Sequence, residues 1–298
     1  MIKKSLNRIK GSLYGVAVGD SLGAPVEFMS AEEIKHRHGQ VRDMMPGGWL
    51  NVHPGEVTDD TQMTLAVADG IIADPVCPIR EIGNRFIAWA DGRPKDIGGT
   101  CAMSINNAKM LLKAGVDSES AWKKAGIQTA QYNHGRSGGN GALMRTVYTG
   151  LYYNDRDVID KTADIAEMTH ADDISTSLCV QYSVIIQKFI QMRDKVGNDM
   201  FYAIYTDTKC DDQRAPTGWS MDSFRCAAYS IHNYNGFEKS LIAAVNLGGD
   251  ADTIGAITGG LAGSMYGFDA IPTRWIEQLD RDVRDKLDYL AAAAFAHC

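Results

Sequence analysis

Several kinds of sequence signal are absent from this chain of 298 residues, and each absence excludes a class of protein. Its six cysteines include no C-x-x-C pair, which argues against a zinc ribbon or a thioredoxin-like redox motif. Acidic residues outnumber basic ones, 37 against 30, and the basic residues form no stripe, so we expect no nucleic-acid partner. No G-x-S-x-G motif and no cysteine-protease signature is present, so neither protease arrangement is supported.

Long apolar runs are also scarce. The uncharged run over residues 254–268 is too short and too rich in glycine to cross a membrane, so we expect no membrane insertion. Basic residues at positions 3–10 precede a short apolar stretch that loosely resembles a signal peptide, but Asp20 follows at once and the helical spacing continues. We therefore expect a first helix of the mature domain, and a cytoplasmic protein with free thiols.

Helical periodicity is what the sequence has in abundance. Apolar residues recur at three- and four-residue spacing in five segments, residues 6–17, 63–71, 178–189, 254–265 and 276–287. The period-two alternation typical of strands is scarce, and no linker, low-complexity tract or internal repeat interrupts the chain. The sequence therefore predicts an all-α fold, a single compact many-helix domain over residues 1–298 with long glycine-rich loops.

Two acidic clusters, far apart in the sequence, carry most of the functional information. They are Thr58-Asp59-Asp60-Thr61 and Gly248-Gly249-Asp250-Ala251-Asp252-Thr253, and a helical pattern begins after each. Either cluster alone is most simply a helix cap, because Asp and Thr are favoured at N-cap positions. Together they hold more anionic oxygen than capping uses, and gathered carboxylates are costly without a cation. Because every ligand is an oxygen, the pair predicts an Mg²⁺ or Mn²⁺ site.

Four further residues are candidates, each with a plainer alternative. Asp96, before a Gly-Gly pair, is either a catalytic carboxylate or a loop-capping residue. Glu27 is either an acid of the metal centre or a surface charge. His170, which precedes a helix, is a cleft residue or a structural histidine, and Trp219 is a stacking face for a base or a core residue.

The glycine turn Gly138–Gly141 leads into an apolar helix start that contains Arg145. Its backbone N–H groups offer a cradle for a diphosphate, although a plain turn explains the sequence equally well. Arg145 itself is a candidate for a phosphate contact or for a structural salt bridge.

Taken together, these motifs resemble the ADP-ribosylglycohydrolase family, and within it the dinitrogenase reductase-activating glycohydrolases. The matching stretches are Gly15–Ala24 with Glu27-Phe28-Met29, Gly47–Leu50 with Thr58–Thr61, Arg93–Gly98, Gly139–Ala142, Thr169-His170, and Ala244–Thr253 with Ala262-Gly263 and Tyr266-Gly267. The resemblance spans almost the whole chain and is thin around 110–135 and 187–214. The paired Thr-Asp-Asp and Gly-Gly-Asp-x-Asp-Thr motifs are highly specific in combination.

The resemblance implies an all-helical fold with a binuclear Mg²⁺ or Mn²⁺ centre at the bottom of a cleft. The positions matching the family's metal ligands are Thr58, Asp59, Asp60, Asp250, Asp252 and Thr253, and Glu27 matches an acid of the same centre. Asp96 matches a carboxylate with a catalytic role, and His170 matches a histidine of the substrate cleft. The positions matching the loop that holds the diphosphate of ADP-ribose are Gly139, Asn140 and Gly141.

Two positions depart from the family pattern. Gly99 stands where the family has asparagine in a Gly-Asn-Thr motif, and Trp219 stands where a tyrosine is expected. Both positions are expected to contact the substrate, so both changes bear on how the substrate sits. Neither change removes a metal ligand.

The reaction implied by the resemblance is hydrolysis of the N-glycosidic bond between ADP-ribose and an arginine of a target protein. The subfamily implies the nitrogenase iron protein as the target and a PII-type signalling protein as a regulator. Two alternatives stay open. One is a hydrolase of the same fold that acts on another ADP-ribose linkage or target, and the other is a non-catalytic ADP-ribose-binding protein.

Overall fold

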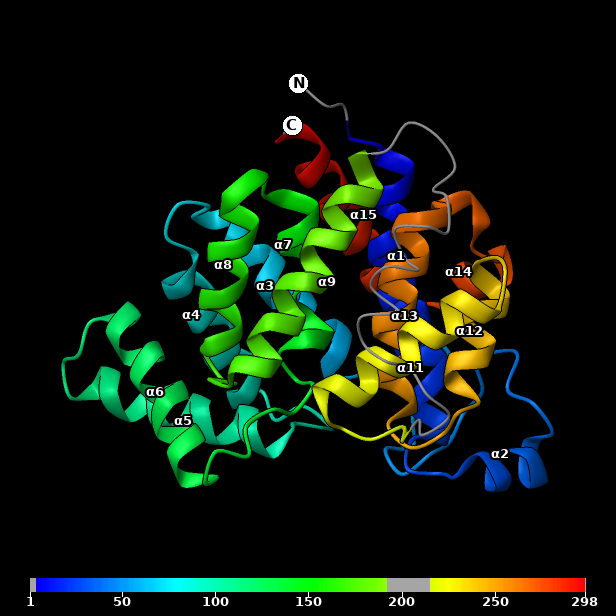
Figure 1. Cartoon of the computed structure of the whole chain (residues 1–298), viewed down its shortest axis with the longest axis horizontal. Helices are drawn as coiled ribbons and strands as arrows, with labels where there is room; N and C mark the ends of the chain where they lie inside the picture. Colours follow the sequence, from blue (N-terminus) through cyan, green and yellow to red (C-terminus); the bar gives the residue numbers. More distant parts are fainter. Residues whose placement is uncertain (1–3, 192–214, 298) are drawn as a thin grey trace.

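The computed structural model describes residues 4–191 and 215–297, and helices dominate this part of the chain (Figure 1). The α-helices are α1 (Leu6–Gly23), α2 (Ala31–His38), α3 (Asp59–Ala73), α4 (Pro78–Asp91), α5 (Gly99–Lys113), α6 (Ser118–Tyr132), α7 (Val147–Tyr152), α8 (Asp155–Glu167), α9 (Asp173–Gln191), α11 (Ser220–Asn233), α12 (Phe237–Val245), α13 (Ala251–Tyr266), α14 (Thr273–Gln278) and α15 (Arg281–Ala296). Short 3-10 helices are η1 (Ala24–Val26), η2 (Leu143–Arg145) and η3 (Phe268–Ala270). Within the described ranges extended backbone pairs only at isolated bridges, so the all-α prediction is confirmed.

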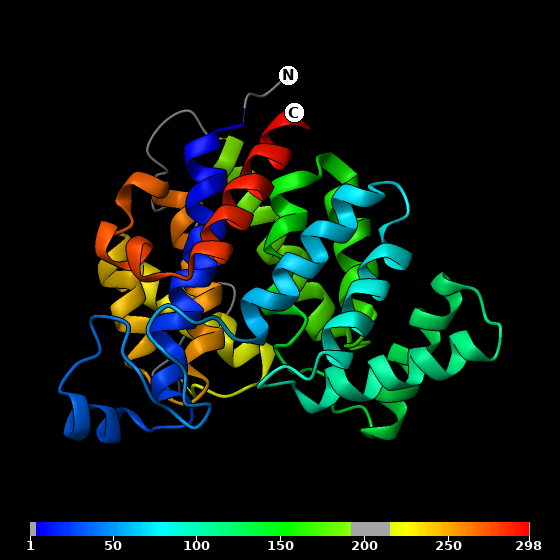
Figure 2. The same cartoon turned by 180° about the vertical axis from the view of Figure 1, so that it is seen from behind.

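The centre of the fold is an antiparallel pair of buried helices, α1 and α13, which lie side by side in both views (Figures 1 and 2). The small residues that face each other are Gly11, Gly15, Gly19 and Gly23 of α1 and Gly263, Gly259, Gly255 and Ala251 of α13. A Cβ atom added to Gly15 would lie 2.0 Å from the carbonyl oxygen of Gly259. The two helices therefore touch backbone to backbone, which only glycine permits.

This register brings the C-terminal end of α1 and the N-terminal end of α13 together, since Gly23 faces Ala251. Other helices cover the pair, with α11 and α12 packing on α13 and α15 packing on α1. The α5–α6 pair lies at the side of the molecule away from α1 and α13 (Figures 1 and 2). The packing thus places the start of the second acidic cluster beside the end of the first helix.

Four of the five predicted helical segments lie within α1, α3, α9 and α13. The fifth prediction, one helix over residues 276–287, is wrong, because α14 ends at Gln278 and α15 begins at Arg281. The backbone N–H of Asp280 donates to the carbonyl of Gly55 at 3.2 Å, and Leu279 is buried. Asp280 therefore makes this tertiary hydrogen bond in place of a hydrogen bond within a helix. The three- and four-residue spacing of apolar residues continues across the break.

Cys77, Cys101 and Cys179 are free thiols, as expected, whereas Cys210 and Cys298 lie outside the described residues. Among the described helices, none combines the length and the apolar character needed to span a bilayer.

Candidate active site

The two acidic clusters meet at a cleft of about 470 Å³ near the N-terminal ends of α3 and α13. The acids that line it are Glu27, Asp59, Asp96, Asp250 and Asp252. The loops that line it include residues 97–101, 139–141 and 216–218. Thr58 and Asp60 are buried and do not line the open part of the cleft. Residues from distant parts of the sequence therefore converge on one acidic hollow, as the sequence predicts.

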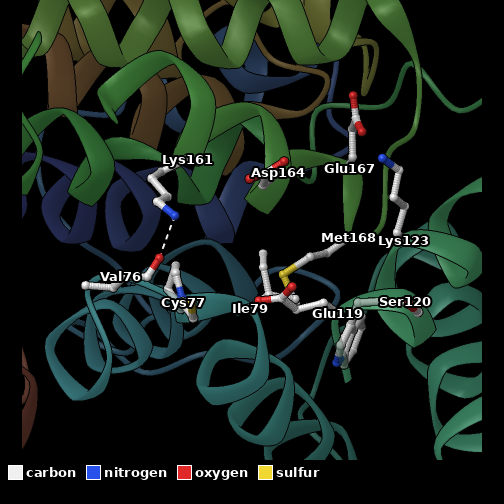
Figure 3. A pocket seen from close by; sticks show the side chains of 12 residues that line it. Val76, Cys77, Ile79, Glu119, Ser120, Lys123, Lys161, Asp164, Glu167 and Met168 are labelled. Atoms are coloured by element: carbon white, nitrogen blue, oxygen red, sulfur yellow. Dashed lines mark hydrogen bonds between the residues drawn. The ribbon is translucent and has the colours of Figure 1, made fainter. Parts of the chain in front are cut away.

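A second cavity, also of about 470 Å³, lies between the start of α4 and helices α6 and α8 (Figure 3). Side chains of both charges surround it, among them Lys123, Lys161, Asp164 and Glu167, and Lys161 donates to the carbonyl of Val76 at 2.5 Å. None of the candidate residues from the sequence lies among the described residues that line it. The acidic cleft is therefore the candidate active site.

Carboxylate oxygens of Glu27, Asp250 and Asp252 lie within 4.8 Å of one another. Deeper in the site, the hydroxyl of Thr253 donates to Oδ2 of Asp60 at 3.3 Å. The other oxygen of Asp60, Oδ1, is buried and has no hydrogen-bond partner among the described residues. An unpartnered buried carboxylate oxygen is costly, and a divalent cation with oxygen ligands would remove that cost. The donor set therefore fits a hard metal ion.

Burial and mutual repulsion raise the pKa values of these carboxyl groups. Burial, together with the nearby Asp20 and Asp59, raises the pKa of Asp60 well above its ordinary value. Burial, followed by repulsion from Asp96 and Asp20, raises the pKa of Asp59 to about 8. Burial raises the pKa of Glu27 to about 7, against the lowering effect of its hydrogen bond from Trp49. Near neutral pH the site must therefore take up protons or a cation.

Asp20, at the end of α1, has a supporting role that the sequence analysis missed. Thr58 is the N-cap residue of α3, yet its side chain makes no capping hydrogen bond. Instead Asp20 accepts the N–H groups of Thr58 and Thr61 at 3.0 and 3.1 Å and their hydroxyls at 2.8 and 2.5 Å. The capping of α3 thus falls to Asp20, and the acids of the first cluster are free of it. An acid within a helix of buried glycine and apolar residues is the sequence feature that marks it.

The second cluster is also not used for capping. Asp250 is the N-cap residue of α13, and its side chain makes no capping hydrogen bond. Its Oδ2 atom instead accepts the side-chain amide of Asn140 at 2.7 Å. The same amide donates to the hydroxyl of Ser223 at 2.8 Å, and the backbone N–H of Asn140 donates to the carbonyl of Gly218 at 3.0 Å. Asn140 therefore joins the glycine turn to the second acidic cluster.

Arg145 supports the glycine turn at residues 138–141 from within the core. It is fully buried, makes no ion pair with the described residues, and donates to the carbonyl of Gly141 and the hydroxyl of Thr169, both at 2.8 Å. Its guanidinium lies over the ring of Phe86, 4.9 Å from the centroid. Arg145 is therefore neither a cleft-lining phosphate ligand nor half of a salt bridge, and it fixes the backbone of the glycine turn.

His170 lines the cleft beside this turn, and Nδ1 of its ring lies 2.7 Å from the hydroxyl oxygen of Thr169. Because Arg145 only donates, the Thr169 hydroxyl accepts from it, and its own proton is available to Nδ1 in the tautomer of His170 that carries the proton on Nε2. Burial, and then the charge of Arg145, lower the pKa of His170 to about 3, so its ring is neutral. A Cβ atom on Gly141 would lie 3.0 Å from Cε1 of His170, so the ring closely contacts the turn.

The remaining candidates lie at the edges of the cleft. Asp96 is half-buried, and its Oδ1 atom accepts the N–H of Ile97 at 2.7 Å. Burial is the main cause that raises the pKa of Asp96, and the nearby Asp250 adds to it. Gly99 begins α5 and lines the cleft. Trp219 is not among the described lining residues, and its ring packs beside Gly138, where an added Cβ atom would lie 2.8 Å away.

Comparison with known proteins agrees with this geometry. The family model of the ADP-ribosylglycohydrolases matches residues 1–298. The chain is 32% identical to ADP-ribosyl-[dinitrogen reductase] glycohydrolase of Rhodospirillum rubrum, over 97% of both chains. It is 29% identical to ADP-ribosylarginine hydrolase Tri1 of Serratia proteamaculans, over 97% of this chain and 81% of that one. A solved structure described as an ADP-ribosylglycohydrolase-related protein complex shares the fold, with a TM-score of 0.79, 27% identity and 98% coverage of each chain.

The chain therefore belongs to the ADP-ribosylglycohydrolase family. It is a glycohydrolase that removes ADP-ribosyl groups.

Proposed function

We propose that this enzyme hydrolyses the N-glycosidic bond that joins ADP-ribose to an arginine of a target protein. The observation that carries the proposal is the convergence of buried carboxylates at an open cleft, where Oδ1 of Asp60 has no partner among the described residues. The names of two relatives support the linkage, because one is called an ADP-ribosylarginine hydrolase and the other a glycohydrolase of dinitrogen reductase. From the glycohydrolase of dinitrogen reductase we propose the nitrogenase iron protein as the target. A PII-type regulator stays a prediction from the subfamily resemblance.

Seven residues would hold two Mg²⁺ or Mn²⁺ ions in this proposal. They are Thr58, Asp59, Asp60, Asp250, Asp252, Thr253 and Glu27. When bound, such ions would polarise a ribose hydroxyl or a water molecule and neutralise the clustered acids. The unpartnered oxygen of Asp60 and the carboxylates of Glu27, Asp250 and Asp252 support this assignment.

Residues of the chain would carry out the acid–base part of the reaction. The bond breaks through a state with oxocarbenium character at the ribose carbon. The electron pair of the C–N bond goes to the guanidine nitrogen, which gains a proton, and water supplies the hydroxyl that joins the ribose carbon. Asp96 would act as general base or stabilise the developing positive charge, and its half-buried position on the cleft wall suits both roles.

The diphosphate part of the substrate would lie along the glycine turn. Backbone N–H groups of Gly139 and Gly141 would hold the diphosphate beside the neutral ring of His170, whereas the N–H groups of Asn140 already donate to Gly218, Asp250 and Ser223. Gly99 and Trp219 would contact the substrate at the edges. We also propose that residues 1–298 act as one domain, since α1, near the start of the chain, packs along α13, near its end.

The test measures released ADP-ribose from an arginine-ADP-ribosylated protein, using metal-stripped enzyme with and without added Mn²⁺ or Mg²⁺. We expect no turnover in excess EDTA and recovery with either ion, because every proposed ligand is a hard oxygen. Full activity of the stripped enzyme in EDTA would contradict the metal assignment. A parallel panel of serine-linked and O-acetyl-linked ADP-ribose tests the alternative linkages, and tight ADP-ribose binding without any turnover would identify a non-catalytic binding protein.

A further inference from the structure

Two exposed aromatic rings lie at the acidic cleft. Phe28 and Trp49 both line it, with 68% and 53% of their surfaces exposed. Their ring centroids lie 5.6 Å apart, with the ring planes inclined by 41°. Adjacent apolar side chains that stay exposed at the rim of a polar site mark a place where a ligand or partner binds.

The backbone at Phe28 is built to present this ring. Its φ angle is +64°, a left-handed conformation that bulky residues rarely adopt. Two backbone hydrogen bonds hold it, from Phe28 N–H to the carbonyl of Gly249 and from Gly249 N–H to the carbonyl of Met29, both 2.7 Å long. Gly249 directly precedes Asp250 of the second acidic cluster. A strained conformation maintained beside a functional cluster is typical of residues with a functional role.

Trp49 is fixed to the same site by its polar edge. Its indole N–H donates to Oε2 of Glu27 at 2.6 Å. Two backbone hydrogen bonds of 2.9 Å between Gly47 and Val52 close the loop that carries Trp49. Because the only polar atom of the side chain bonds to Glu27, what Trp49 exposes at the cleft is apolar ring.

Aromatic faces and carboxylates together favour one kind of ligand group. Ring faces attract cations, and the guanidinium group is a planar, weakly hydrated cation that stacks on them. Asp96 lines the same cleft and is not one of the proposed metal ligands, so its carboxylate adds negative charge that the ions would not take up. No lysine or arginine lies among the described residues that line the cleft.

We propose that Phe28 and Trp49 form the subsite for the guanidinium of the ADP-ribosylated arginine, and that this pair selects arginine linkages over uncharged ones. The inference rests on the proposed arginine linkage and deepens it. The rings then contact the leaving group, whereas the glycine turn at residues 139–141 contacts the ADP-ribose part.

Four variants separate the ring contact from other effects. Phe28→Leu keeps an apolar side chain at the strained position and removes the aromatic face, and Phe28→Tyr keeps the face. Trp49→Phe keeps a ring and removes the N–H group that bonds to Glu27. Tyr132→Leu is the matched control, because Tyr132 is 73% exposed at the end of α6 and does not line the cleft. Each variant is assayed for kcat/KM on an arginine-linked and on a serine-linked substrate, for inhibition by free ADP-ribose, and for melting temperature.

We expect Phe28→Leu to lower kcat/KM on the arginine-linked substrate by about threefold to thirtyfold, the range of one cation–π contact. Inhibition by free ADP-ribose should stay within about twofold, since the product lacks the guanidinium. Tyr132→Leu should behave like the wild type, and Phe28→Tyr, which keeps the aromatic face, should recover most of the kcat/KM that Phe28→Leu loses. Trp49→Phe should retain the selectivity for arginine and lose turnover through the freed Glu27.

Two results would overturn the subsite. One is an unchanged kcat/KM in Phe28→Leu, and the other is an equal loss of substrate turnover and ADP-ribose binding. If instead the wild type releases nothing from the arginine-linked substrate but hydrolyses another linkage, the proposed function itself fails, and the guanidinium subsite fails with it.

Discussion

Replacing Gly259 by alanine should strongly destabilise the protein although alanine is the better helix former. The added Cβ atom would lie 1.9 Å from the carbonyl oxygen of Gly15 and 2.5 Å from its carbonyl carbon. Ordinary contact begins near 3.4 Å, so α1 and α13 must separate by roughly 1.5 Å at this point. Overpacking of this kind costs about 3 kcal/mol or more, because the obstacle is backbone and not a flexible side chain.

The higher helix propensity of alanine offsets only about 1 kcal/mol of this loss. We therefore expect a net loss of about 2 kcal/mol or more, which lowers the melting temperature by at least about 3 °C in a protein of this size. The matched control is Gly99→Ala, since Gly99 is also helical and no atom lies within 4 Å of an added Cβ. Thermal and urea unfolding of both variants compare the effects. A Gly259→Ala protein as stable as Gly99→Ala would refute the backbone contact.

Three further predictions concern the acids. Asp96→Asn should lower turnover at least about a hundredfold, with ADP-ribose affinity and metal content little changed; normal single-turnover rates with a lower melting temperature would reassign Asp96 to the loop. Asp60→Ala and Asp252→Ala should each lose bound metal and turnover while circular dichroism stays native. Variants that still bind two metals and turn over at the wild-type rate would show that the two clusters are helix caps. Metal-free protein should lose stability as the pH rises from about 4 to about 8, because folding raises the pKa of Glu27 to about 7 and of Asp59 to about 8, so the folded state holds protons that the unfolded chain releases. Melting curves in EDTA across that range would contradict this if stability rose, and added Mg²⁺ should flatten the dependence.

The meeting of the two acidic clusters could be predicted from the sequence because each contains more carboxylate than a helix start can use. The register that brings them together could not, because it depends on glycines. Apolar periodicity detects side chains that bury surface, and glycine has none to bury. The four-residue spacing from Gly11 to Gly23 is nevertheless present in the sequence, and a search for small residues at that spacing would have found the α1 face.

The supporting residues were harder to predict for a different reason. Arg145 was expected to meet an anion, because an exposed or cleft arginine usually does. In the structure its partners are the carbonyl of Gly141 and the hydroxyl of Thr169, which no sequence pattern links to it. The division between α14 and α15 was missed in the same way, because a single bond from Asp280 to Gly55 decides it.

Asp20 and Asp60 show how a structural acid can be told from a functional one. Both are buried, both belong to the same acidic region, and burial raises the pKa of each. Asp20 accepts hydrogen bonds from two backbone N–H groups and two hydroxyls, so its charge is satisfied by the chain that it anchors. Asp60 has one oxygen without any described partner, so its charge remains for a bound ion to neutralise. The hydrogen bonds that Asp20 provides to α3 hold Asp60 in that unsatisfied position, and this makes the folded chain receptive to a cation.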